Sequence, residues 1–535
     1  MNNYRGMPLF VFAIAGIAIL NCTSPDRVAS GSSSETVVGK IANAGGTPAG
    51  NTKVTLYPDT YNPVAAAPLP DSSSDTTNDS GEYAIKVPDS SVRYNIQAVN
   101  ISQLTRVLIT GIAILGDTTY VPEATLTVPG TIKLLLPDSV DNVNGYVYIP
   151  GTGIVANLFG NNGFVILDSV PAGIVPAIYY GVRNSSVGKV LHYNIPVSPG
   201  DTVIVWKYSR QITLNTTTSG AGVAGNVIDF PVLVRLTTGN FNFAQANADG
   251  SDLRFAKPDG SPLPYEIERW DASQARAEVW VRVDTVFGSD NSQYVTMYWG
   301  NSGATDSSSG GAVFNTVDGF EGVWHLDSTG NDATVNNHSG TYVATTDTVG
   351  IIGHCQKFTV TAYARISGLL NTPSVVTLSA WALLNRPDII GSEVVSVGDA
   401  VLIRMDDSWK NKGTQGAYCV NPFGGADSTH CVAQSGQFMQ QTGWHYLAYS
   451  VDIANRIQSL YIDGAVCCST DSTVSIRYTN VGSDTYFGRH GNGRTGFNFI
   501  GNIDEVRVDK TVRSADWIKL CYMNQRTDDK LVVFK

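Results

Sequence analysis

Two adjacent carboxylates, Asp504 and Glu505, lie in the segment GNIDEVRVDKTVRSADWIK at residues 501–519, which has the pattern of a short strand followed by a helix. Successive side chains of a strand point to opposite faces, so Asp504 is expected to share a face with Val506 and Val508. Glycosidases need two carboxyl groups that face each other across the sugar, about 5 to 10 Å apart. This neighbouring pair therefore does not predict an acid/base pair.

Asp504 is the more unusual of the two residues, because a carboxylate on an apolar face keeps its charge only with a cation, a metal ion or several N–H donors. Two interpretations stay open, a metal ligand and a hydrogen-bonded structural carboxylate. Glu505 is expected on the opposite face with Arg507, as a surface ion pair that contributes at most about 1 kcal/mol.

The composition favours strands and several domains. The chain has 535 residues, 53 glycines, 24 tyrosines and only 15% charged residues, which suits strands and turns better than helices. A chain of this length rarely folds around a single hydrophobic core, so three or four domains are expected. The formal net charge of -11 argues against a nucleic-acid partner, which calls for basic patches.

The N-terminus, MNNYRGMPLFVFAIAGIAILNC, has an apolar run at residues 9–20 that is too short to span a bilayer. ILNC resembles a bacterial lipobox, which implies that Cys22 is lipidated and becomes the mature N-terminus. Thr23 after the cysteine resembles lipoproteins of the outer membrane, so the resemblance implies a lipid-anchored envelope protein that is periplasmic or surface-exposed. An ordinary secretory signal or anchor is the alternative.

Two small units follow. The runs KVTLY and EYAIKV alternate apolar and polar residues around the turn signal DSG, which predicts a small antiparallel sandwich. This part resembles the carboxypeptidase regulatory-like, transthyretin-like module. GYVYIPGTG and NNGFVILDSVPAG repeat the pattern and predict a second small sandwich.

The motifs WKYSRQITLN, DFPVLVRL, YEIERWD and YVTMYWGN resemble the bacterial domain of unknown function 2341. Glu266 and Glu268 lie two residues apart in the third motif and so share a strand face. Such a pair could hold a cation or a sugar, although a solvated strand face is the commoner case. The resemblance does not decide between them, because the role of that domain is unassigned.

The last part carries GFEGVWHLDSTGNDATVNNHSGTYV, VTLSAWALL, GWHYLAYSVD, IQSLYIDGA and GNIDEVRV in this order, and it resembles the laminin-G-like, concanavalin A-like jelly roll. The predicted fold class is all-β, with tandem small β-sandwiches followed by this C-terminal jelly-roll sandwich.

The expected parts are a lipoprotein signal peptide and lipobox (1–22), a flexible linker (23–35), a carboxypeptidase regulatory-like sandwich (36–129), a second small sandwich (130–205), the domain of unknown function (206–301), a linker (302–317) and the laminin-G-like domain (318–535).

The loop DSTGNDATVNNHSGT at residues 327–341 resembles the D-x-(S/T)-x-N-x-x-x-G-T loop of laminin-G-like domains. In that family a calcium ion often lies between this loop and the acidic residue of the final strand, so the resemblance implies calcium as a cofactor. Calcium takes six to eight oxygen ligands. Asp332 and Asp504 are the leading candidates, with Asp327 and Asn336 as weaker ones. A calcium-free polar turn remains the alternative.

Six of the seven cysteines lie in the last domain. An even number of cysteines in an exported domain suggests disulfides. Cys419 and Cys431 bracket the hairpin-like stretch VNPFGGADSTH and are predicted to form a bridge. For the other four cysteines, free buried thiols remain an alternative.

The motifs of common enzymes are absent from the sequence. The last domain has no Glu-x-Asp-x-(x)-Glu strand, and the chain has no H-E-x-x-H, G-x-S-x-G or P-loop motif. The sequence therefore predicts no enzymatic activity, although a discontinuous triad could still assemble.

Taken with the resemblances, the prediction is a lipid-anchored envelope or cell-surface protein whose jelly roll binds carbohydrate, either a polysaccharide or a glycoprotein. One alternative is a structural or adhesive surface protein that binds another protein. The other is a cryptic glycoside hydrolase that uses Glu266 and Glu268.

Overall fold

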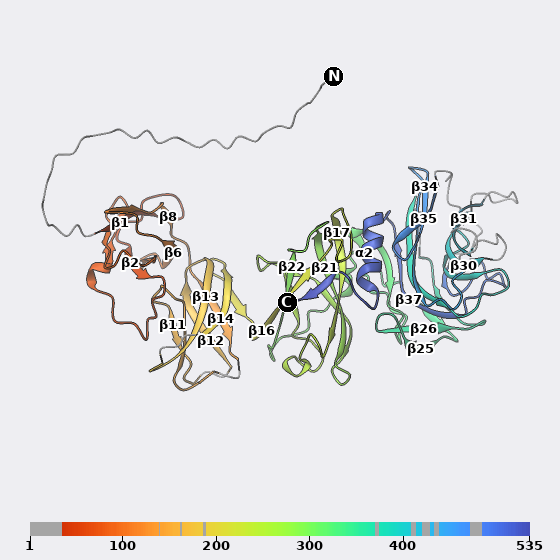
Figure 1. The fold of residues 1–535 in the computed structure, drawn as a ribbon, viewed down its shortest axis with the longest axis horizontal. Helices are drawn as coiled ribbons and strands as arrows, with labels where there is room; N and C mark the ends of the chain where they lie inside the picture. Colours follow the sequence, from red (N-terminus) through yellow and green to blue (C-terminus); the bar gives the residue numbers. More distant parts are fainter. Residues whose placement is uncertain are drawn as a thin grey trace, which may run out of the picture. The chain divides into compact units, whose positions relative to one another are not determined.

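The computed structural model describes residues 35–137, 140–160, 163–185, 189–369, 374–407, 413–419, 428–432, 438–470 and 484–535. These residues are nearly all β (Figure 1), which confirms the predicted fold class. The chain divides into two compact units, Met1–Tyr61 with Ala67–Thr127, and Asn62–Ala66 with Val128–Lys535. Within the described parts, no helix has the length and apolar character needed to cross a membrane. Cys22 lies outside them.

The first unit contains a small sandwich of two sheets around one apolar core. One sheet has the order β4 (Glu82–Lys86), β1 (Thr36–Ala42) and β7 (Thr118–Tyr120), with β8 (Ala124–Thr125) also on β1. The other has the order β3 (Ser74–Thr76), β2 (Lys53–Pro58), β5 (Tyr94–Asn100) and β6 (Thr105–Ile112). Strand β4 alternates strictly between buried and exposed residues, as its sequence predicts.

The second unit begins with another small sandwich that has its own core. One sheet has the order β11 (Val155–Asn157), β10 (Gly145–Tyr148), β13 (Gly173–Val182) and β14 (Lys189–Val197). The other has the order β12 (Phe164–Val170), β9 (Gly130–Leu135) and β15 (Thr202–Val205).

A third sandwich follows, and the last strand of the chain belongs to it. One sheet has the order β19 (Pro262–Leu263), β18 (Arg254–Ala256), β22 (Tyr294–Trp299), β16 (Tyr208–Leu214) and β38 (Val532–Phe534). The other has the order β17 (Val227–Thr237), β21 (Arg276–Val286) and β20 (Tyr265–Asp271). Strand β38 pairs with β16 over three residues, so the C-terminus returns to a domain that lies about 300 residues earlier in the sequence.

The jelly roll is the largest part. Its eight-stranded sheet has the order β25 (Thr346–Val349), β26 (His354–Phe358), β37 (Gly501–Asp509), β28 (Val375–Leu384), β33 (Trp444–Asp452), β34 (Ile457–Ile462) and β35 (Ala465–Thr470), with β23 (Phe320–Trp324) paired on β37. Its seven-stranded sheet has the order β24 (Thr341–Val343), β27 (Tyr363–Ile366), β36 (Thr485–Phe487), β29 (Ser392–Val397), β30 (Val401–Asp407), β31 (Gly413–Cys419) and β32 (Ser428–Val432).

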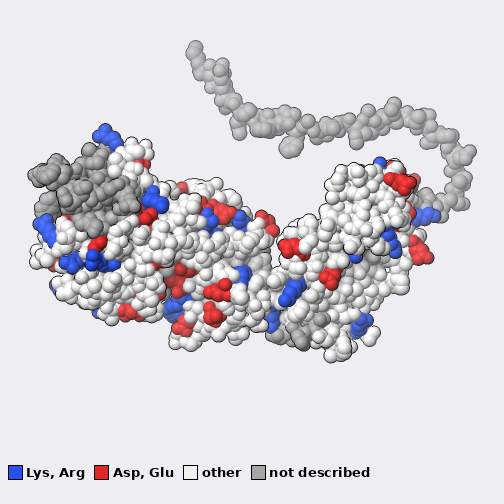
Figure 2. Space-filling model, turned by 180° about the vertical axis from the view of Figure 1, so that it is seen from behind, with Lys and Arg blue, Asp and Glu red and all other residues white. Residues whose placement is uncertain are grey.

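The third sandwich and the jelly roll share one core. Helix α2 (Ala515–Gln525) follows β37 and packs against β17 (Figure 1), with Trp517 and Ile518 buried in a cluster that also holds Phe230 of β17. The side chain of Asn524 accepts a hydrogen bond from Leu233 N (2.7 Å) and donates one to Leu233 O (3.0 Å). This shared core positions the charged groups described below. Figure 2 shows that acidic and basic side chains are interspersed over one face of the molecule.

Candidate functional site

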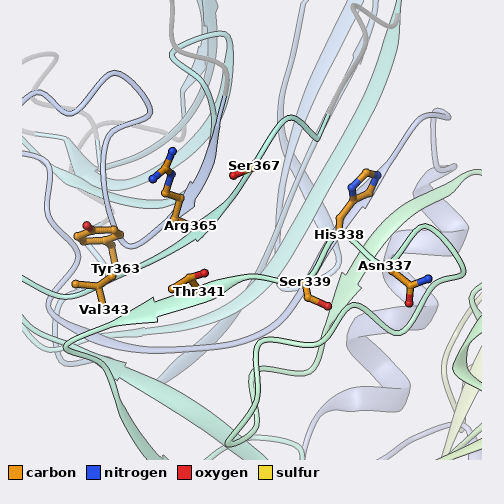
Figure 3. A pocket seen from close by; sticks show the side chains of 8 residues that line it. All are labelled: Asn337, His338, Ser339, Thr341, Val343, Tyr363, Arg365 and Ser367. Atoms are coloured by element: carbon orange, nitrogen blue, oxygen red, sulfur yellow. The ribbon is translucent and has the colours of Figure 1, made fainter.

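A pocket opens on the solvent face of the seven-stranded sheet, where β24 and β27 pair (Figure 3). In β27, Ala364 and Ile366 face the core, so Tyr363 and Arg365 face outward. The pocket has a volume of about 360 Å³. It is lined by Asn337, His338, Ser339, Thr341, Val343, Tyr363, Arg365 and Ser367.

Neighbouring side chains hold Tyr363 and Arg365 in place. The Arg365 guanidinium forms an ion pair with Asp484 at 2.6 Å, which raises the pKa of the arginine above its usual value. The Tyr363 ring lies 5.8 Å from the Tyr486 ring, edge to face. The Arg489 guanidinium lies 4.8 Å from the centre of the Tyr363 ring, within cation–π distance.

No motif in the sequence singles out Tyr363 or Arg365. The available signal was the alternation in TAYARI, which places both residues on one face of a strand. The pocket also depends on the pairing of β27 with β24, which motif spacing does not reveal.

Asp332, a predicted calcium ligand, orders the loop that leads into this pocket. Its Oδ1 accepts hydrogen bonds from Val323 N (3.0 Å) and Thr334 N (2.9 Å). Its Oδ2 accepts from Thr334 Oγ1 (2.9 Å) and His338 N (2.8 Å). Both oxygens of this carboxylate thus have donors from the protein.

The two weaker calcium candidates also have partners within the chain. Asp327 Oδ1 accepts from Thr329 N (2.7 Å) and Thr329 Oγ1 (2.8 Å), and Asn336 Nδ2 donates to Glu321 O (2.9 Å). Calcium binding by these residues stays a prediction.

Asp504 contacts a different loop from Asp332. Its Oδ2 accepts from Ile351 N (2.9 Å) and Ile352 N (3.1 Å), in the connection between β25 and β26. These hydrogen bonds do not involve the loop at residues 327–341, so they do not bring Asp504 to Asp332.

A β-bulge in β37 decides how its carboxylates are oriented. Ser379 of β28 lies opposite Arg507, and Trp381 lies opposite Asp504, so two residues of β37 face a single residue of β28. Glu505 is one of the two and has a left-handed backbone conformation, with φ of 51°. The extra residue changes the order of faces along the strand.

Because of this bulge, two predictions for β37 are wrong. Val506 and Val508 face the jelly-roll core together with Ile503, whereas Asp504 contacts the loop that packs on the third sandwich. Asp504 therefore does not share a face with the two valines. Glu505 is only 1% exposed, so it does not form a surface ion pair.

Glu505 meets His325 and two glutamates from the third sandwich. His325 directly follows β23, and its Nδ1 lies 2.6 Å from Glu505 Oε1 and 3.6 Å from Glu268 Oε2. Its Nε2 lies 3.3 Å from Glu266 Oε2. Glu266 and Glu268 share a face of β20 as predicted, but this face is buried, with side chains 15% and 3% exposed.

Arg507 completes the group, which we call the junction cluster and define as Glu266, Glu268, His325, Asp504, Glu505 and Arg507. Arg507 Nη2 donates to Glu505 Oε2 at 3.0 Å. Its guanidinium lies over the rings of Trp280 (4.6 Å) and Phe314 (5.1 Å). Trp280 Nε1 in turn donates to Glu268 Oε2 at 2.7 Å.

The charges of the junction cluster shift several pKa values. Burial acts to lower the pKa of His325, but the surrounding carboxylates, led by Glu505, hold it well above its usual value. Burial raises the pKa of Glu268 to about 8. Burial and the charge of Glu505 raise the pKa of Asp504 well above its usual value. The cluster thus carries more carboxylates than its cations neutralise, and it favours uptake of a proton or a cation.

A second charged group lies on the seven-stranded sheet. Arg404 forms ion pairs with Glu393 and Asp407, both at 2.7 Å. His490 Nε2 lies 3.2 Å from Asp399 and 3.6 Å from Glu393. Burial lowers the pKa of His490 to about 4, so this histidine is neutral near pH 7.

Among the described cysteines, Cys355, Cys467 and Cys521 are free thiols. Cys468 takes part in a disulfide bond. The structure does not describe the side chains of Cys419 and Cys431, so the predicted bridge between these two residues stays a prediction.

Comparisons with known proteins identify two domains. Residues 249–330 match a domain of unknown function, DUF2341. Residues 337–519 match the concanavalin A-like lectin/glucanases superfamily. The chain therefore contains both domains that its motifs resemble. The lipobox and the carboxypeptidase regulatory-like module stay predictions. Curated proteins give no match.

Several solved structures resemble part of the chain. Domain 4 of AbnA, a GH43 extracellular arabinanase from Geobacillus stearothermophilus in complex with arabinotriose, is 18% identical with a TM-score of 0.31, over 38% of this chain and 97% of that one. The binding domain of botulinum neurotoxin serotype D is 12% identical with a TM-score of 0.30, over 41% and 53%. The Ruminococcus gnavus IT-sialidase CBM40 bound to α2,3-sialyllactose is 14% identical with a TM-score of 0.23, over 28% and 82%. Each of these matches covers less than half of this chain.

Proposed function

We propose that the protein is a lipid-anchored envelope or cell-surface protein that binds carbohydrate in the pocket on β24 and β27. The observation that carries this proposal is the composition of that pocket: one aromatic ring, one guanidinium and a set of hydroxyl, amide and imidazole groups. The match of residues 337–519 to the concanavalin A-like lectin/glucanases superfamily supports the same class of ligand.

The chemistry of a sugar fits this lining. A sugar ring carries hydroxyl groups on its rim and C–H groups on its faces. The Tyr363 ring offers a surface for the C–H groups. Ser339, Thr341 and Ser367 offer hydroxyl donors and acceptors, and Arg365 offers N–H donors. A few placed polar groups around an aromatic side chain are typical of small-molecule sites.

The pocket supports binding rather than hydrolysis. Its eight lining residues include no carboxylate, whereas glycoside hydrolysis needs two across the scissile bond. The hydrolase alternative relied on Glu266 and Glu268, but both lie against His325 with little exposure. We therefore propose that the protein is not an enzyme.

The carbohydrate proposal can be tested with the full chain carrying Cys22→Ser, which removes the lipidation site. A glycan array, followed by calorimetry on the hits, is run with calcium and with chelator, because calcium remains a proposed cofactor. We expect Tyr363→Ala to weaken binding by at least about tenfold, since aromatic anchors often dominate an interface. We expect Arg365→Ala to weaken it as well.

A matched control is Tyr120→Ala, which removes a tyrosine that is 81% exposed in the first unit. It is expected to leave the affinity unchanged. The proposal fails if no glycan binds, or if Tyr363→Ala retains the affinity of the wild type.

Lipidation is tested separately. Expression of the wild type in a bacterial host should give a membrane-associated form, and Cys22→Ser should become soluble or stay unprocessed. An unchanged distribution between membrane and soluble fractions would contradict the anchor.

A further inference from the structure

Carboxylates from two domains surround one imidazole at the junction between the third sandwich and the jelly roll. Glu268 comes from β20 of the third sandwich, whereas His325 and Glu505 come from β23 and β37 of the jelly roll. We infer that these three residues form a binding site for one divalent transition-metal cation, which fastens the two domains together.

The geometry of the three side chains suits one ion. One ligand atom from each residue lies within 4.8 Å of the others. Metal ligands of these types bind at about 2.0 to 2.2 Å, so two ligands on opposite sides of an ion are at most about 4.4 Å apart. His325 Nδ1 lies 2.6 Å from Glu505 Oε1 and 3.6 Å from Glu268 Oε2, so the Glu505 side chain must rotate slightly away from the imidazole for the two to bind the same ion. Glu266, at 3.3 Å from the other imidazole nitrogen, flanks the site.

The donor types indicate the class of metal. An imidazole nitrogen together with carboxylate oxygens is a common set for zinc and its neighbours in the first transition row. Calcium prefers a shell made of oxygen ligands. The inferred site therefore differs from the calcium site predicted at Asp332 and Asp504 in both its residues and its ion.

Asp504 supplies an independent observation. This residue is fully buried, and its Oδ2 accepts two backbone N–H groups. Its Oδ1 has no hydrogen-bond partner in the described structure. Asp504 precedes Glu505 in β37, and the charges of Glu505 and Glu268 both act on it. A buried carboxylate oxygen without a donor is costly, and a nearby cation would compensate for it.

The charge balance also favours a cation. Four buried or nearly buried carboxylates meet here, namely Glu266, Glu268, Asp504 and Glu505. The fixed positive charges near them are those of Arg507, which is paired with Glu505, and Arg235, which Asp529 and Glu278 share with Glu268 and Asp504. The four carboxylates therefore exceed these positive charges by at least two when His325 is neutral, and a divalent ion would offset that excess. Without the ion, protons must supply the missing charge.

Neighbouring donors already orient the ligands. Trp280 Nε1 holds Glu268 at 2.7 Å, and Arg507 holds Glu505 at 3.0 Å. Such supporting hydrogen bonds fix the orientation of metal ligands and raise the affinity for the ion. Because the cluster is almost fully buried, the ion must enter during folding or during local opening.

The test uses the full chain with Cys22→Ser, unfolded and refolded with either chelator or zinc, and then passed over a desalting column. We expect about one zinc per chain by elemental analysis. At a zinc concentration about 100 times Kd, we expect a rise in Tm of about 5 °C relative to the chelator-treated protein. With calcium in place of zinc, the calcium content of Glu268→Gln is expected to equal that of the wild type, because this site does not bind calcium.

Glu268→Gln keeps the shape of the side chain and removes one anionic ligand, so it should lose both the bound zinc and the rise in Tm. His325→Gln should do the same. If His325→Gln fails to fold, Glu268→Gln still decides the test. The matched control is His354→Gln, which removes an exposed histidine paired with Asp347 at 2.8 Å; it should keep the zinc.

The inference is overturned if the refolded wild type retains no zinc and its Tm is indifferent to zinc, which would mean that protons alone balance the cluster. It is equally overturned if Glu268→Gln keeps the zinc while His354→Gln loses it, which would show binding at the surface.

Discussion

Two buried histidines of the jelly roll respond to burial in opposite ways. His325 lies in the junction cluster and His490 lies on the seven-stranded sheet, and each has a carboxylate within 3.2 Å. Burial acts to lower the pKa of both. Yet the pKa of His325 is held well above its usual value, whereas that of His490 falls to about 4.

The difference lies in the other charges around each ring. Three carboxylates act on His325. At His490, the charge of Asp399 is opposed by the charges of Arg404 and Arg494. Burial thus sets the cost of a charge, and the local excess of one sign decides which group carries it. The junction cluster favours a protonated His325, whereas the arginines beside His490 oppose its protonation.

The largest expected effect comes from removing a positive charge at the junction. Arg507 is 1% exposed and pairs with Glu505. Arg507→Met keeps most of the side-chain volume but leaves the carboxylate without this partner. We expect a loss of about 3 to 5 kcal/mol in the free energy of unfolding, as for other broken buried pairs. Urea denaturation at pH 7 with chelator measures it.

The matched control is Arg365→Met, which breaks the ion pair of an exposed arginine with Asp484. We expect no resolvable change in the urea midpoint, because exposed ion pairs contribute little. Equal effects of the two substitutions would remove the distinction between the buried cluster and the surface.

The next effect concerns acid stability and His490. Its pKa is about 4 in the folded protein and about 6.5 in an unfolded chain. Below pH 6.5 the unfolded state binds a proton that the folded state does not. The free energy of unfolding therefore falls as the pH decreases from about 6.5 to 4, by about 3 kcal/mol in total from this residue. Urea midpoints measured across this range report the loss.

His490→Gln should remove this part of the pH dependence. The groups that act on His490 are Asp399, Arg404, Arg494 and Asn492, and Glu393 lies at 3.6 Å. His192 also has a pKa lowered to about 4 by burial, but it lies in β14, so its contribution remains in the variant. If the urea midpoints of the wild type and the variant depend on pH in the same way, His490 is protonated in the folded state.

The sequence was sufficient for the class of fold and for two of its domains. Alternation in runs such as EYAIKV predicted strands with one buried face, and β4 shows that pattern. The ordered motifs from GFEGVW to GNIDEVRV predicted the concanavalin A-like domain, which the comparison confirms. These signals are local or lie in the order of motifs, so they can be recognised in the sequence without knowledge of tertiary contacts.

The candidate sites depended on features that alternation cannot reveal. The β-bulge at Glu505 adds one residue to β37. The side chain of Glu505 therefore lies in the buried junction cluster and not on the surface, where the alternation predicted it. Glu266 and Glu268 did share a face, but only the packing of the third sandwich on the jelly roll determined that His325 would cover it. The same is true of Tyr363, which becomes part of a pocket only when β24 lies beside β27.

The smallest expected effect concerns an exposed histidine–carboxylate contact, which separates the effect of burial from the effect of the residue types. His354 and Asp347 form a histidine–carboxylate contact at 2.8 Å, with side chains 43% and 39% exposed. The contact resembles that of His325 with Glu505 in its chemistry but not in its surroundings. We expect His354→Gln to change the free energy of unfolding by at most about 0.5 kcal/mol, because solvent and salt screen an exposed pair. Urea denaturation at low and high salt measures this change.

The contrary outcome is a loss of several kcal/mol in the free energy of unfolding, or a loss that persists at high salt. It would show that a histidine–carboxylate contact is strong even when exposed. Burial would then no longer explain the behaviour of the junction cluster.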